Sequence, residues 1–139
     1  MTRIKYDMSL MKLISLFETL TQAAVKDCFV DNKEVLTFIV AENEMGKAIG
    51  KGGSNVHRIE KALNRKIKIV EYNPDLLKFV ENAIYPLKAR QIVQVDDIVE
   101  ITPSDHLTRG YLIGRAAVNL HNTEKVVQRF FPIQKIKVL

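Results

Sequence analysis

The sequence has a single cysteine and no apolar run long enough to cross a lipid bilayer. Cys28 stands alone among 139 residues, which excludes an internal disulfide and a cysteine-rich metal site. A membrane span needs about 20 consecutive apolar residues, and no segment of this chain approaches that length. Residues 1–7 are polar and basic and lack the apolar core of a signal peptide. We therefore expect an intracellular, cytoplasmic protein without a metal site or another cofactor.

Acidic residues are scarce in two segments. Residues 45–68 hold seven Lys and Arg but one acid, and residues 109–137 hold six Lys and Arg but one acid. These segments together carry +11, whereas the whole chain carries +5, so the remainder carries −6. A run of charge is usually a solvated surface. Because each basic segment is centred on a helix–turn–helix pattern, the distribution favours a polyanionic partner.

Glycine is also scarce, with six residues in the chain, yet three of them lie within four positions. Gly50, Gly52 and Gly53 surround Lys51, and glycine permits positive φ and close approach of a ligand to the backbone. Apolar residues at helical spacing predict a helix that begins at Ser54. Such a loop presents amide N–H groups at a helix N-terminus, where an anion is favoured. The loop therefore predicts a phosphate site, and a plain helix–helix turn is the alternative.

The sequence around the loop excludes two common nucleotide sites. A nucleoside-triphosphate loop has four residues between its first glycine and a Gly-Lys-Ser/Thr sequence. Here three residues separate Gly46 from Gly50, and Gly52 follows Lys51, so no hydroxyl stands where a magnesium ion would need it. A dinucleotide fingerprint is excluded because no long hydrophobic parallel-strand pattern leads into the loop. The remaining interpretation is a loop that clamps a nucleic-acid backbone.

Hydrophobic periodicity predicts the order α-β-β-α-α-β in each half of the chain. The elements expected in the first half are a helix over 9–26, strands over 27–31 and 34–41, helices on both sides of the glycine loop, and a strand over 66–70. Those expected in the second half are a helix with Asn73 as its cap and Pro74 at its first position, strands over 91–95 and 97–102, a helix over 118–129, and a strand over 135–138.

The two halves are copies of one module. An offset of 64 residues gives seven identities in the sixteen positions 46–61, including Gly46 with Gly110 and Gly50 with Gly114. The repeat predicts domains at 1–73 and 74–139. After its last helix the second copy has five extra residues, around Phe130, before the Lys-Ile-Lys sequence recurs.

These residues resemble a known family. The element order and the Ile-Gly-Lys-Gly-Gly loop at 49–53 are similar to a KH domain of type II topology, in which the extra helix and strand precede the core. Two such domains in tandem resemble the archaeal NusA-like transcription factors, and the second loop at 113–120 fits the same pattern. The resemblance covers nearly the whole chain. It implies an α+β fold of two tandem type II KH modules, each a small mixed three-stranded sheet packed on helices.

The resemblance implies a function without catalysis. The expected activity is binding of single-stranded RNA in transcription elongation, termination or antitermination. RNA polymerase and other transcription machinery are further candidate partners, and neither a membrane nor a small-molecule substrate is expected. The alternative is an RNA-binding protein of the ribosome or of its assembly, because a small-subunit ribosomal protein also carries such a module.

An enzyme is the third possibility, and the residues give it little support. His57 with Glu60 recurs as His121 with Glu124, which resembles an acid–base pair. No serine or cysteine nucleophile and no metal-ligand set accompanies these residues, so the interpretation is a helix-surface pair. Glu44 is expected to be a solvated loop carboxylate.

The resemblance also implies roles in the first loop. Gly50 and Gly53 would allow the tight turn, Gly52 would leave room for the RNA backbone, and Lys51 would meet a phosphate. A basic rim would surround the loop, and three of its residues are spaced at i, i+3 and i+7 along one helix face. The rim consists of Lys47 followed by Arg58, Lys61 and Arg65.

Two roles remain open between function and structure. Ile49, with Val56, forms either an apolar floor under the bases or ordinary core. Asn55 either hydrogen-bonds RNA or satisfies the start of the helix.

The second loop is expected to contact RNA less closely. It contains Gly114, Arg115, Ala116 and Ala117, and Asn119 follows it in the helix. Alanine suits helices, so the turn should survive, but its methyl groups would restrict approach of the RNA backbone. Arg115 keeps the positive charge of Lys51.

Overall fold

The structure is a computed structural model that describes residues 8–139, and these divide into two compact units between Asn73 and Pro74. Each unit has the predicted order α-β-β-α-α-β, with one short 3-10 helix added in the loop. No helix in the described residues has the length and apolar character needed to cross a membrane. The expectation for residues 1–7 lies outside the part of the chain that is described.

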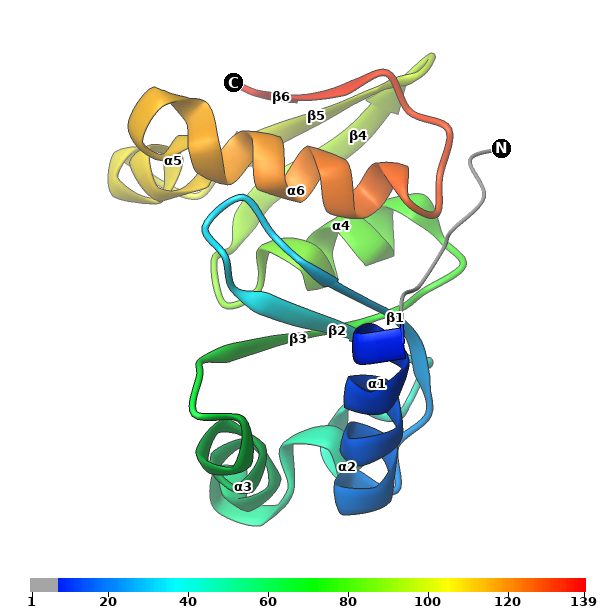
Figure 1. Ribbon diagram of the computed structural model, residues 1–139. Coiled ribbons are helices and arrows are strands. Elements are labelled where there is room, and N and C mark those ends of the chain that lie inside the picture. The colour runs from blue at the N-terminus through cyan, green and yellow to red at the C-terminus, as the bar shows by residue number, and fades with distance from the viewer. Residues whose placement is uncertain (1–7) are drawn as a thin grey trace. The chain divides into compact units, whose positions relative to one another are not determined.

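The first unit is a mixed three-stranded sheet with its helices on one side (Figure 1). Strand β2 is central: it pairs antiparallel with β1 and parallel with β3. The β-branched and aromatic sequence LTFIV of β2 is buried throughout, as a central strand requires. The elements are α1 (Met8–Thr21), β1 (Val25–Val30), β2 (Leu36–Val40), α2 (Met45–Ile49), η1 (Lys51–Gly53), α3 (Ser54–Leu63) and β3 (Ile67–Glu71).

The core of the first unit joins these helices to the sheet. Phe17 of α1 stacks on Phe38 of β2, with ring centroids 4.2 Å apart. Ala48 of α2 and Ile59 of α3 are fully buried in the same cluster, so the helices on both sides of the loop are held by apolar side chains. Cys28 is fully buried there as well and packs as a small apolar residue.

The second unit repeats this arrangement, with β5 between antiparallel β4 and parallel β6. The extra residues of this half contribute to its core, because the ring of Phe79 contacts those of Phe130 and Phe131 at centroid distances of 5.4 and 5.7 Å. The elements are α4 (Leu76–Ile84), β4 (Ala89–Val95), β5 (Ile98–Pro103), α5 (His106–Ile113), η2 (Arg115–Ala117), α6 (Val118–Gln128) and β6 (Lys135–Val138).

The first helix ends five residues earlier than predicted. After Thr21 the chain turns at Gln22, whose φ is +62°. The Thr21 hydroxyl accepts a hydrogen bond from the backbone N–H of Ala23 at 3.0 Å, and a Glu18 carboxylate oxygen accepts one from Val25 at 2.9 Å. Because a glutamine holds the left-handed position that glycine usually takes, the sequence carried no stop signal there.

Two boundaries in the second half were also wrong. Asp75 caps α4 by accepting a hydrogen bond from the backbone N–H of Leu77 at 3.2 Å, so Asn73 and Pro74 precede the helix. Strand β4 begins at Ala89 rather than at residue 91.

Candidate nucleic-acid interface

The glycine loop connects α2 to α3 through three residues with positive φ. Gly50 has φ +75° and ψ 169°, Gly52 has φ +61° and Gly53 has φ +77°. A Cβ atom on Gly50 would lie 2.8 Å from Cγ of Asn55, which is closer than packing allows, whereas a Cβ on Gly52 would have no atom within 4 Å. Gly50 is therefore required by the turn itself. The backbone at Gly52 is bare and open to solvent.

The second loop repeats this geometry without its second and third glycines. Gly114 has φ +74° and ψ 176°, close to Gly50, and a Cβ there would lie 2.7 Å from Cγ of Asn119. Ala116 and Ala117 hold φ +53° and +60°. The high helix propensity of alanine does not explain why alanine is accepted at these two positions. The left-handed backbone costs a non-glycine residue roughly 1–2 kcal/mol. The surrounding turn imposes the conformation.

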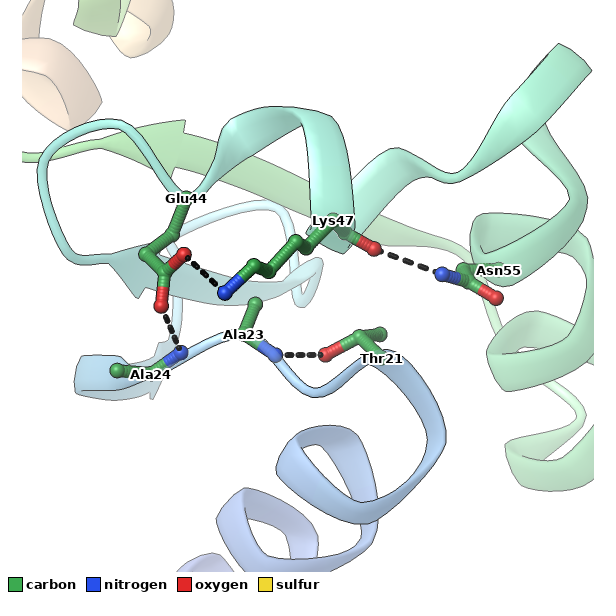
Figure 2. Close-up of polar contacts among 6 residues, drawn as sticks. All are labelled: Thr21, Ala23, Ala24, Glu44, Lys47 and Asn55. Carbon is green, nitrogen blue, oxygen red and sulfur yellow. Dashed lines mark hydrogen bonds and ion pairs between the residues drawn. The ribbon is translucent and has the colours of Figure 1, made fainter.

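A side-chain amide closes each loop. Nδ2 of Asn55 donates a hydrogen bond to the carbonyl of Lys47 at 2.7 Å (Figure 2), and Nδ2 of Asn119 donates to the carbonyl of Tyr111 at 2.8 Å. Each bond ties the first turn of one helix to the preceding helix. The helix-start alternative for Asn55 is not supported, because its amide bonds the preceding helix and α3 has no side-chain cap bond. The contact of Asn55 with RNA stays a prediction.

Glu44 anchors the start of α2 to the backbone just before β1, contrary to the expectation of a solvated carboxylate. Its side chain accepts a hydrogen bond from the backbone N–H of Ala24 at 3.2 Å and pairs with Nζ of Lys47 at 3.2 Å (Figure 2). The Ala24 hydrogen bond, followed by Lys47, lowers the pKa of Glu44 below its ordinary value. The Lys47 ammonium therefore already has a partner within the fold.

The exposed positive charge runs from the loop along α3. Lys51, Arg58 and Lys61 all have exposed side chains. Arg65 does not extend this face, because α3 ends at Leu63 and Arg65 donates a hydrogen bond to the backbone carbonyl of Glu34 at 3.1 Å. The predicted row of three along one helix face was wrong at that residue.

Apolar surface lies beside the same loop. Ile49 is 37% exposed, although its neighbour Ala48 is fully buried. Ile49 therefore lies at the surface and outside the fully buried core. Val56, in the first turn of α3, is half-buried.

The repeated glutamates attach a helix to the following strand. Glu60 accepts a hydrogen bond from the backbone N–H of Ile67 at 3.0 Å, and Glu124 accepts one from Ile136 at 2.9 Å. The accompanying His57 and His121 are exposed. Sequence reasoning missed this structural role, although the recurrence of glutamate at the same offset was a signal for it.

Comparison with known proteins gives consistent matches. The KH domain family matches residues 13–105. The probable transcription termination protein NusA of Methanocaldococcus jannaschii is 33% identical over 129 residues, which cover 91% of this chain and 70% of that protein. The protein of the same name from Halobacterium salinarum is 34% identical over 129 residues, 91% of this chain and 92% of that protein. The protein of that name from Methanococcus vannielii is 32% identical over 141 residues, which cover 99% of this chain and 80% of that protein.

A solved structure shares the whole fold. The crystal structure of APE1850 superposes with a TM-score of 0.76 at 28% identity, and the match covers 96% of this chain and all of that one.

Proposed function

The chain belongs to the KH domain family and is a member of the archaeal NusA family, and we propose that it binds single-stranded RNA in the cytoplasm during transcription elongation, termination or antitermination. Each unit, 1–73 and 74–139, is proposed to be one type II KH module. The proposed activity is binding without catalysis. The relatives are named probable transcription termination proteins, and this name supports a role in transcription. It gives no support to a ribosomal role.

The open backbone at Gly52 is the observation on which the RNA-binding proposal rests. A KH loop clamps about four nucleotides by their backbone and needs room for phosphates against its amides. Gly52 has no atom within 4 Å of where its Cβ would lie, and Lys51 beside it is exposed. The exposed Ile49 on one side supplies an apolar contact for a base. Arg58 and Lys61 continue the positive charge along α3.

The remaining predicted residues fill supporting roles in this proposal. Gly50, Gly53 and Asn55 set the turn, and the ion pair with Glu44 leaves Lys47 a smaller share in phosphate binding. In the second unit Gly114, Ala117 and Asn119 set the same turn, and the exposed Arg115 and Ala116 face solvent. RNA polymerase is a further proposed partner, on the strength of the relatives' name alone.

A binding comparison tests the proposal. We expect an RNA strand selected from a random pool to bind more tightly alone than in a duplex, because the KH cleft takes unstacked nucleotides. We also expect affinity to fall with salt at a logarithmic slope of about −0.7 per phosphate neutralised, hence about −3 for one four-nucleotide contact. Fluorescence anisotropy over a series of salt concentrations measures both.

The variant Lys51→Ala serves as the internal check. It should lower affinity and reduce the salt slope by roughly 0.7, because one phosphate contact is lost. Equal affinity for the duplex, or a slope near zero, would contradict the proposal. Recovery of the protein with ribosomal particles rather than with RNA polymerase would redirect it to the ribosomal alternative.

A further inference from the structure

Tyr111 occupies in the second unit the position that Lys47 occupies in the first. Both lie on the helix that leads into the loop, and the carbonyl of each accepts the amide of the loop-closing asparagine, Asn55 or Asn119. Their side chains differ in environment. The Lys47 ammonium pairs with Glu44, whereas Tyr111 is 57% exposed and, among residues 8–139, its side chain has no hydrogen bond or ring contact.

The exposed ring is part of a small apolar face on α5. Leu107, four residues earlier and therefore on the same face of the helix, is 69% exposed. Single exposed apolar residues are common on protein surfaces, so the exposure gains meaning from its place, on one face of the helix that leads into a predicted binding loop.

The charge around this face indicates what that partner is. Residues 106–123 contain no aspartate or glutamate, and the exposed Arg115 lies in the loop one turn beyond Tyr111. An aromatic ring beside a positive loop is the usual platform for a nucleotide, with the base on the ring and the phosphate near the cation. A stable protein–protein interface would need a larger apolar area on this surface than two side chains provide.

We propose that Tyr111 stacks on a base of the bound RNA, so that the second unit holds its nucleotide by the base where the first unit holds the backbone. The inference rests on the proposed RNA binding. It also accounts for the two alanines of the second loop. Their methyl groups restrict the backbone, and a stacked base recovers the affinity lost there. Stacking is tolerant of sequence, because every base has a flat face.

Two substitutions separate stacking from apolar contact. Tyr111→Leu keeps apolar bulk and removes the ring, and we expect it to weaken binding of the selected single-stranded RNA roughly 5- to 100-fold. Tyr111→Phe keeps the ring and should stay within about threefold of the parent affinity. Tyr85→Leu is the matched control, because Tyr85 is 68% exposed and lies in the same unit after α4, outside the loop and its two flanking helices.

The composition permits a second, direct measurement. The chain has no tryptophan and four tyrosines, so tyrosine emission can be followed alone. RNA should quench this emission in the parent protein, because a stacked base quenches the ring. Tyr111→Phe should retain affinity and lose the quenching, and Tyr85→Phe should retain both.

The outcomes distinguish this inference from the function on which it rests. If Lys51→Ala weakens RNA binding but Tyr111→Leu does not, the RNA-binding function holds and the stacking inference fails. If Tyr111→Leu leaves RNA affinity unchanged but abolishes binding to RNA polymerase, the apolar face of α5 binds protein and the inference fails. If the parent protein binds no RNA, both fail. Thermal melts of each variant verify that the exposed substitutions leave the fold intact.

Discussion

At the scale of single residues, the glycines of the first loop are not equivalent. Gly50 combines φ +75° with ψ 169°, a region that only glycine enters readily, and a side chain there would collide with Asn55. Gly52 has left-handed φ and open space around it. The first glycine therefore shapes the turn, and the second keeps its outer surface bare.

This difference predicts two stability effects. Gly50→Ala should destabilise the protein by about 3 kcal/mol, from backbone strain and the clash together. Gly52→Ala should cost about 1 kcal/mol, because only the left-handed strain applies, and Ala116 already tolerates that conformation at φ +53°. Urea unfolding measures both. Equal costs for the two variants would show that the collision with Asn55 is relieved by a rotation of that side chain.

The residues found from the sequence were those whose chemical type is distinctive. Three glycines around Lys51 marked the loop without knowledge of the fold. Glu44 was misread, because its partner Ala24 lies twenty residues away and is a backbone N–H. A carboxylate that holds a distant amide leaves no pattern in the sequence. Tyr111 was visible as the counterpart of Lys47 at the repeat offset, but its exposure was not.

At the scale of elements, α2 is the flanking helix of the first loop that depends most on contacts with the rest of the fold. It has five residues, too few for a helix that is stable in isolation. Buried Ala48 holds one side of it. The carboxylate of Glu44, the residue before the helix, joins its first turn to the backbone of Ala24, and Asn55 holds its last turn.

The anchor at Glu44 predicts a dependence on pH. Because the folded state lowers the pKa of this carboxyl below 4.5, its stabilising effect is complete above pH 4.5 and is lost as the pH falls through the folded pKa. Glu44→Gln should therefore lower the melting temperature at pH 7, and the difference from the parent protein should vanish at low pH. Melts from pH 7 downward test this, with Glu42→Gln as control. A difference that persists in acid would assign the effect to packing.

Element types were predictable and element ends were less so. Alternating Lys and Ile predicted the strand at β3, and the run of β-branched residues predicted β2. The end of α1 depends on a left-handed Gln22 and on the side chain of Glu18, which reaches a strand that starts after the turn. Such contacts form only once the tertiary structure exists, so periodicity extended the helix too far.

At the scale of the whole molecule, the repeat preserves backbone geometry while the side chains diverge. The two loops share their turn angles, their closing asparagine and their strand-holding glutamate. They differ where a ligand would meet them, at the pairs Gly52 with Ala116 and Lys47 with Tyr111. A repeat that keeps the backbone scaffold and changes the residues of the contact surface indicates that the two units contact their ligand differently.

The unequal loops give the last prediction. Aspartate is among the residues that accept left-handed backbone, so Gly52→Asp and Ala116→Asp should both fold. A carboxylate at Gly52 would add bulk and negative charge where a phosphate is proposed to lie, and we expect roughly tenfold weaker RNA binding, or about 1.4 kcal/mol. At Ala116 a methyl group already limits approach, so the same change should cost less. Titrations at one salt concentration, with melts as control, compare them. A larger loss at Ala116 would make the second loop the principal backbone clamp and reverse the roles assigned to the two units.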